Sequence, residues 1–322
     1  MLTPEWLTTQ LQKAGVLDRG TVLSIDSGDR HSYTASMQRL SLQYSPDAPS
    51  TAPSRLIIKQ NIRQPELDFH QQIAPRTKGD YLLRCYAAGI EGNTRYLLMD
   101  DLTDTHEEPI DTLPQPISTC EKLVDILADF HTQWWGYTEP TEDVIGFVQQ
   151  QAANGFAQFV DTLGDRLSEQ RRGWLERVLA APPRHMDRLT RNEQITLVHG
   201  DPHYWNFLYP RTPDGQIYLL DWAVWHRNLP TSDICYQITQ LCSPERRARI
   251  EQPLVRRYHE QLQARGISGY TWDQCWQDYR LALVEHTLWI VFWQQVAPPG
   301  IWWRALENFT GAFEDLGCEE LL

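Results

Sequence analysis

Several patterns that identify common protein classes are missing from this 322-residue sequence. It contains neither a Gly-x-x-x-x-Gly-Lys-Ser/Thr motif nor a Gly-x-Gly-x-x-Gly motif, which excludes P-loop and dinucleotide-binding Rossmann proteins. Its six cysteines include no Cys-x-x-Cys pair. We therefore expect reduced, mostly buried thiols of the kind found in cytoplasmic proteins.

Long apolar runs and basic residues are also scarce. The longest candidate membrane stretch, residues 288–293, is far shorter than the roughly 20 residues needed to cross a bilayer. The first residues lack the basic region and the apolar core of a signal peptide. Lysine and arginine total 29 against 42 acidic residues, and the net charge of −13 argues against a nucleic acid partner. We expect neither a membrane nor a nucleic acid partner.

The most informative stretch is residues 197–222, where a polar loop between apolar runs carries His199, Asp201 and Asn206. Thr212 to Gly215 suits a type I turn, so the runs on either side should form a hairpin. Antiparallel pairing would bring Asn206 opposite Asp221 to within about one residue, with both at the open end beside Asp201. Two carboxylates and an amide oxygen form the kind of site that hard cations such as magnesium prefer.

The pattern His-Gly-Asp, four residues, Asn, and a second Asp about twenty residues after the first resembles the signature of the aminoglycoside phosphotransferase and choline kinase superfamily. The resemblance implies that Asp201 is the catalytic base, that Asn206 and Asp221 bind magnesium, and that His199 braces the loop. It also implies ATP or GTP as phosphate donor and a hydroxyl of a small molecule as acceptor. Trp222 stands where protein kinases have Phe-Gly, which argues against a protein kinase and makes Trp222 a candidate substrate contact.

The amino-terminal part of the sequence predicts strands. Residues 21–25 and 37–44 alternate apolar and polar side chains. Between them, residues 26–36 would form the loop that covers the nucleotide phosphates, with Gly28 and Ser32 as candidate contacts. A plain hairpin loop is the alternative for this segment.

A further strand is predicted at residues 55–60 and places Lys59 near its end. In the kinase interpretation Lys59 contacts the nucleotide phosphates and is held by Glu66, which opens the next helix after a proline. Taken singly, each residue has a solvated surface charge as its alternative, and their order and spacing before the central motif favour the paired interpretation.

An apolar strand at residues 96–102 runs into acidic residues where two lobes should join. In kinases the adenine bonds to the backbone at this place, so four residues are candidate hinge contacts: Met99, Asp100, Asp101 and Leu102. The expected fold is α+β and bilobal, similar to protein kinases, with a small, mainly antiparallel β lobe at residues 1–102 and a larger helical lobe at residues 103–322.

Helical periodicity begins near residue 118, and His131 on this helix is expected to be a packing residue. Asp233 resembles the Asp that braces the catalytic loop in this fold, and a helix N-cap is the alternative. Glu285 and Trp289 share one face of a largely apolar helix, where they would hold an amine of the acceptor or belong to a Trp-rich core with a paired carboxylate.

Other interpretations of the central motif remain open. His199 and His203 could bind zinc in a hydrolase, although no further ligands at motif spacing are evident. A catalytically silent pseudokinase is a second alternative, against which the complete set of Lys59, Asp201, Asn206 and Asp221 argues. The identity of the acceptor is not fixed by the fold.

Overall fold

The computed structural model describes residues 2–30, 36–108, 115–180, 186–212 and 214–322. The chain divides into two compact units, one formed by Met1–Glu108 with Phe207–Ala223 and the other by Pro109–Asn206 with Val224–Leu322. In this division the first unit runs to residue 108 and takes in the hairpin after Asn206, one strand of which pairs with residues 106–107.

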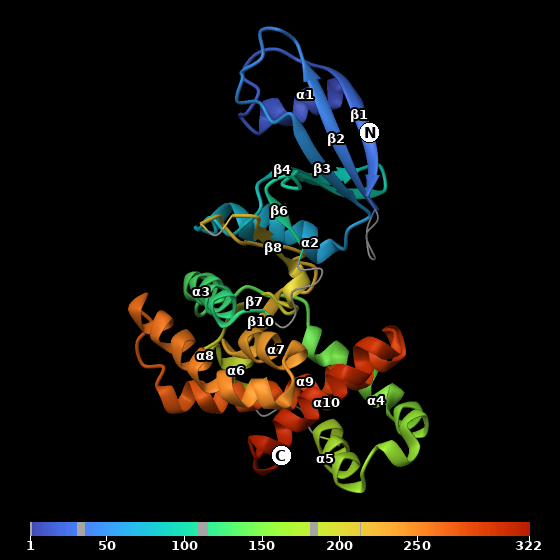
Figure 1. Cartoon of the computed structure of the whole chain (residues 1–322), viewed down its shortest axis with the longest axis vertical. Coiled ribbons are helices and arrows are strands. Elements are labelled where there is room, and N and C mark those ends of the chain that lie inside the picture. The colour runs from blue at the N-terminus through green and yellow to red at the C-terminus, as the bar shows by residue number, and fades with distance from the viewer. Residues whose placement is uncertain (1, 31–35, 109–114, 181–185, 213) are drawn as a thin grey trace. The chain divides into compact units, whose positions relative to one another are not determined.

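The first unit is built on an antiparallel five-stranded sheet in the order β1-β2-β3-β5-β4 (Figure 1). Its strands are β1 (Val22–Arg30), β2 (Ser36–Tyr44), β3 (Arg55–Gln60), β4 (Cys85–Glu91) and β5 (Thr94–Asp100). Its helices are α1 (Pro4–Lys13), α2 (Gln64–Asp68), the π-helix η1 (Phe69–Ile73) and the 3₁₀ turn η2 (Ala74–Arg76).

Helix α1 covers one face of this sheet. Thr3 caps its first turn by accepting the Trp6 N–H, and Pro4 stands where a backbone N–H is not needed. Leu7 and Leu11 lie one turn apart and are fully buried in a cluster with sheet residues such as Leu56. The α1 stripe and the strand side chains that face it therefore form one core of this unit, and a second buried cluster contains Ile62, Leu67, Leu97 and Met99.

The strands β1 and β2 extend further than the alternation of apolar residues predicts. Gly28 lies within β1 and pairs with Arg39, so it is not in the connecting loop expected at residues 26–36. Polar strand residues next to a hairpin carry no apolar alternation, which explains the difference. The predicted contact Ser32 lies outside the described residues.

The hairpin expected from the central motif is present. Strands β6 (His106–Glu107), β8 (Phe207–Pro210) and β9 (Tyr218–Leu219) form a small antiparallel sheet in the order β6-β8-β9. The Gly215 N–H donates to the Thr212 carbonyl at 3.1 Å, the bond expected of a four-residue turn. Since Phe207 pairs with Leu219, Asn206 and Asp221 flank the open end of the hairpin.

The second unit is mainly helical (Figure 1). Its helices are α3 (Ile117–Gln133), α4 (Val144–Leu163), η3 (Gly164–Arg166), α5 (Glu169–Ala180), α6 (Met186–Arg191), η4 (Tyr204–Asn206), α7 (Ser232–Leu241), α8 (Pro244–Ala264), α9 (Trp272–Val296), α10 (Pro299–Asp315) and η5 (Cys318–Leu321). Two short strands, β7 (Thr196–Val198) and β10 (His226–Asn228), pair antiparallel in the same unit.

Helix α9 organises the packing of the second unit. A reciprocal capping box between Thr271 and Gln274 fixes its start, and the helix then packs against α4, α7 and α10. Within the residues that the structure describes, none of the helices has the combined length and apolar character required to cross a membrane. The loop that begins at His199 follows β7 directly, and α7 follows β10, the strand that pairs with β7.

Candidate active site

Lys59 is the centre of an ionic cluster in the first unit, in which Lys59 and Glu66 are buried and Asp221 is partly exposed. Its ammonium group donates to Glu66 Oε1 at 2.6 Å and to Asp221 Oδ1 at 3.1 Å. In β3, Lys59 alternates with Leu56 and Ile58 of the α1 cluster and so lies on the opposite face of the sheet, where it is 7% exposed; Glu66 lies in the first turn of α2. The pair expected from the sequence is therefore formed, and Asp221 joins it from the end of the hairpin.

The charges in this cluster do not balance, because two carboxylates surround one ammonium group. Burial would lower the pKa of Lys59, but the charges of Asp221 and Glu66 outweigh it and raise that pKa. Burial raises the pKa of Glu66, and the charge of Asp221 adds to this effect against the opposing charge of Lys59. The cluster is therefore suited to accept additional positive charge near Asp221.

The backbone of Asp221 is held in an uncommon conformation, with φ of 61° in the left-handed region. The next residue, Trp222, stacks on Phe69 with ring centroids 3.9 Å apart, and its ring nitrogen donates to the Leu219 carbonyl at 3.3 Å. Trp222 is 1% exposed, so it anchors the segment after Asp221 against η1 and does not present its ring as an open substrate surface. Strained residues of this kind cluster at functional sites.

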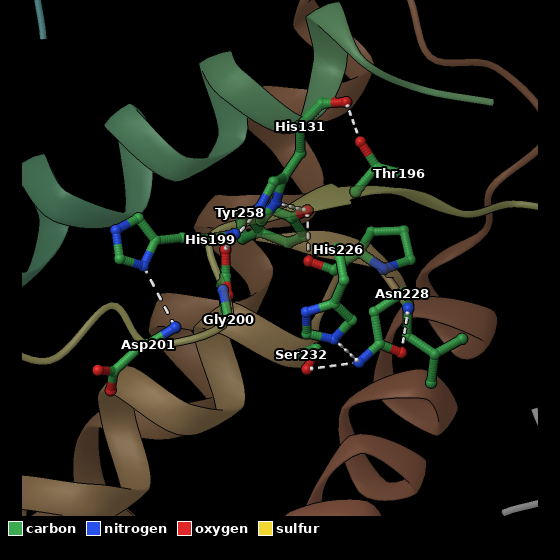
Figure 2. Close-up of polar contacts among 12 residues, drawn as sticks. His131, Thr196, His199, Gly200, Asp201, His226, Asn228, Ser232 and Tyr258 are labelled. Carbon is green, nitrogen blue, oxygen red and sulfur yellow. Dashed lines mark hydrogen bonds and ion pairs between the residues drawn. The ribbon is translucent and has the colours of Figure 1, made fainter. Parts of the chain in front are cut away.

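In the second unit, Asp233 holds the backbone of the loop that carries Asp201. Its carboxylate accepts the His199 N–H at 2.7 Å and the Gly200 N–H at 2.9 Å, one on each oxygen. Asp233 lies inside α7, whose N-cap residue is Thr231, so the geometry is that of the expected brace and not of an N-cap. Figure 2 shows this group of polar contacts around His199 and Gly200.

His131 completes the brace from α3. Its Nε2 lies 3.0 Å from Asp233 Oδ2, and its Nδ1 lies 2.7 Å from the hydroxyl of Tyr258. Burial would raise the pKa of Asp233, but the hydrogen bond and charge of His131 outweigh it and lower that pKa. His131 therefore has a polar role that its helical position alone did not predict; Thr196 also bonds to its carbonyl (Figure 2).

A sharp turn at Gly200 presents Asp201. Gly200 has φ of 84°, and a Cβ at this position would lie 2.5 Å from the Val224 carbonyl oxygen, so only glycine fits. His199 Nδ1 accepts the Asp201 N–H at 3.2 Å, which is visible in Figure 2 and gives His199 the bracing position expected from the sequence. Asn206 Nδ2 donates to the Asp201 carbonyl at 2.8 Å, which closes the loop and leaves the amide oxygen of Asn206 as an acceptor.

Tyr236 and Gln240 are contacts of this loop that the sequence did not reveal. The Tyr236 hydroxyl donates to Asp201 Oδ1 at 2.5 Å, and Gln240 Nε2 donates to the Tyr236 hydroxyl at 3.1 Å. Their spacing of four residues on α7 places them on one face, three and seven positions after Asp233. This spacing could have predicted the contact from the sequence. A helix whose Asp233 faces the loop also directs the residues one and two turns later toward the same loop.

The candidate hinge residues are engaged within the first unit. Met99 is buried and pairs with Ile57 and Cys85 in neighbouring strands, and the Asp100 N–H donates to the Arg84 carbonyl at 3.1 Å. Asp101 Oδ1 accepts the Thr103 N–H at 3.0 Å, and the Leu102 carbonyl accepts the His106 N–H at 2.8 Å. These contacts fix the turn that follows β5.

Glu285 and Trp289 lie in α9 as expected, Glu285 buried and Trp289 partly exposed. Glu285 is 2% exposed and accepts from Asn228 Nδ2 at 3.0 and 3.3 Å. Trp289 packs against Phe292 and Trp293. Glu285 is therefore paired with a buried amide, and its proposed contact with the acceptor stays a prediction. Among the described residues, no group of three or more His, Cys, Asp or Glu side chains is arranged to hold a metal ion.

The chain is similar to a known protein family and to several solved structures. A family model described as the ecdysteroid kinase-like family matches residues 64–266. Among solved structures, the chain is similar to a candidate aminoglycoside phosphotransferase of Ralstonia eutropha, with 12% identity over 99% of each chain and a TM-score of 0.61. It is also similar to ethanolamine kinase of Plasmodium vivax, with 10% identity over 92% of this chain and 83% of that chain and a TM-score of 0.56.

A third similar structure is a choline kinase of Streptococcus pneumoniae, with 14% identity over 95% of this chain and 98% of that chain and a TM-score of 0.50. At these identities the likeness shows the fold, and the expected bilobal fold of protein-kinase-like small-molecule kinases is confirmed. No curated protein sequence matches the chain.

Proposed function

The chain belongs to the ecdysteroid kinase-like family, and from that premise we propose that it transfers the γ-phosphate of ATP or GTP, with magnesium, to a hydroxyl of a small molecule. The observation that carries the proposal is the contact of Lys59 with both Glu66 and Asp221. Lys59 and Glu66 are buried while Asp221 is 34% exposed, and ionic groups of this kind are concentrated at functional sites. It is the arrangement that the kinase interpretation requires for a lysine at the nucleotide phosphates.

The donor atoms in each unit fit magnesium. In the second unit, the amide nitrogen of Asn206 is committed to the Asp201 carbonyl, so its oxygen is the atom available to a cation. In the first unit, Asp221 uses Oδ1 for Lys59 and retains Oδ2. Carboxylate and amide oxygens are hard ligands that suit magnesium. When bound, the metal ion would offset negative charge on the phosphates.

The residues of this chain then have distinct tasks in the proposed reaction. The hydroxyl oxygen of the acceptor attacks the γ-phosphorus, its proton passes to the carboxylate of Asp201, and the nucleoside diphosphate leaves with the electron pair of the broken bond. Lys59 binds phosphate oxygens and stabilises the charge that develops on them. Asp233 and His199 keep the backbone of Asp201 in place.

The test is phosphate transfer from MgATP across a panel of amino alcohols, aminoglycosides, sugars and sterols, measured as ADP formation and as phosphorylated product by mass spectrometry. We expect Asp201→Asn to lower the rate at least about 100-fold, because it removes the proton acceptor. The control is Asp129→Asn, which makes the same change at a surface residue of α3 that pairs with Arg265 at 3.2 Å.

Equal turnover by the wild type and Asp201→Asn would remove Asp201 from its proposed role. A rise in melting temperature with MgATP, without any phosphorylated product, would instead support the pseudokinase alternative.

A further inference from the structure

The carboxylate of Asp201 is held on one side by a hydrogen-bonded chain from α7. Tyr236 is 3% exposed, and its hydroxyl lies 2.5 Å from Asp201 Oδ1. Gln240 Nε2, which can only donate, bonds to the same hydroxyl oxygen at 3.1 Å. Because Gln240 occupies a lone pair of the hydroxyl, the phenolic proton is directed to Asp201.

The second oxygen of Asp201 is less engaged. Asp201 Oδ2 lies 3.4 Å from Asn206 Nδ2, which makes its shorter bond to the Asp201 carbonyl, and 3.6 Å from His203 Nε2. Both distances are longer than an ordinary charge-assisted hydrogen bond. The two oxygens of one carboxylate are therefore unequal, with Oδ1 committed to Tyr236 and Oδ2 open to another donor.

We propose that Tyr236, supported by Gln240, is a positioning residue that fixes the rotation of the Asp201 carboxylate so that Oδ2 meets the hydroxyl of the acceptor. This inference rests on the proposed phosphotransferase function. In the reaction the acceptor proton moves to Oδ2, while Tyr236 keeps its own proton and the bond to Oδ1 persists. Helix α7 would thus hold the loop at two points: Asp233 binds its backbone, and Tyr236 binds the carboxylate of Asp201.

The surroundings of Tyr236 support a fixed donor. Burial, followed by the charge of Asp201, raises the pKa of Tyr236 well above its ordinary value, so the phenol keeps its proton at neutral pH. The ring itself packs against Trp293, with centroids 5.8 Å apart, and against Phe309 at 6.3 Å. A phenylalanine would keep these ring contacts and remove only the hydroxyl.

The test uses Tyr236→Phe in the full chain, with MgATP and either an acceptor identified from the panel or water as acceptor. We expect kcat to fall about 10- to 100-fold, since a misplaced reacting group costs rates of this order. KM for MgATP should stay within about twofold, because Tyr236 contacts Asp201 and the proposed nucleotide lysine is a different residue.

A matched control is available in the same unit. Tyr270 is also buried and donates to a carboxylate, Asp278 Oδ2, at 2.8 Å. Tyr270→Phe therefore removes a bond of the same chemical type away from Asp201. We expect it to lower the melting temperature comparably while leaving kcat unchanged.

A double-mutant comparison separates positioning from a general structural effect. Because Tyr236 is proposed to act through Asp201, Tyr236→Phe should add no further loss of rate in an Asp201→Asn background. A kcat no lower than that of Tyr270→Phe, or an equal loss in both backgrounds, would overturn the inference while the phosphotransferase proposal stands. Absence of phosphate transfer by the wild type would overturn both.

Discussion

Replacement of Asp233 by asparagine is the most direct perturbation of the loop that carries Asp201. An amide presents one acceptor oxygen where the carboxylate presents two, so the N–H of His199 or of Gly200 loses its acceptor. The neighbouring His131 also loses a charged partner 3.0 Å away. Losing one charge-assisted bond at a site that is 1% exposed, with a buried donor left unpaired, should lower the free energy of unfolding by about 3–5 kcal/mol.

Urea denaturation of the wild type and of Asp233→Asn measures this difference, and amide hydrogen exchange at residues 199 and 200 locates it. The control is Asp125→Asn. Asp125 forms a two-pronged pair with Arg257 at 2.8 and 2.6 Å, but both side chains are partly exposed, so the same substitution should cost at most about 1 kcal/mol. Equal losses in the two variants, or unchanged exchange at residues 199 and 200, would refute the brace.

Three further predictions concern other parts of the chain. Burial lowers the pKa of His70 from 6.5 to about 4, so the unfolded chain binds a proton that the folded protein excludes. The free energy of unfolding should therefore fall by about 2 kcal/mol from pH 7 to pH 5 because of His70, whose contribution is fully present above pH 6.5. Urea titrations at several pH values should find a smaller decrease in His70→Phe. Gly200→Ala should abolish phosphate transfer, because its Cβ would meet the Val224 carbonyl oxygen at 2.5 Å; wild-type activity would contradict the assigned turn. Arg247→Met should lower the free energy of unfolding by about 3–5 kcal/mol, because it removes the cation that pairs with the buried carboxylate of Glu251. In urea titrations the double variant with Glu251→Leu should recover much of this loss. No recovery would argue against an unpaired charge as the cause.

The parts of the site that the sequence predicted depend on short-range spacing. The hairpin was predicted because a turn at residues 212–215 lies between two apolar runs, and its register follows from the turn. The contact of Lys59 with Glu66 joins residues seven apart in the chain, within one strand and the helix after it. Patterns of this length are visible in one sequence.

The parts that were not predicted depend on tertiary packing. Tyr236 reaches Asp201 across 35 residues, and its place in a helix otherwise suggested only packing. His131 contacts Asp233, which lies 102 residues away in the sequence. A buried carboxylate needs a polar partner, but the periodicity of a helix does not identify which residue supplies it. Gly28 was assigned to a loop because polar strand residues resemble a turn in their composition.

The first unit is assembled from two separate stretches of the chain. A fragment that ends at residue 108 would therefore lack β8 and β9, and β6 would lose its pairing strand. Lys59 and Phe69 would also lose Asp221 and Trp222, leaving a buried ammonium group with one carboxylate and an uncovered aromatic ring. To produce this unit in isolation, residues 207–223 should be joined to the fragment through a designed linker, because a simple truncation of the chain would omit them.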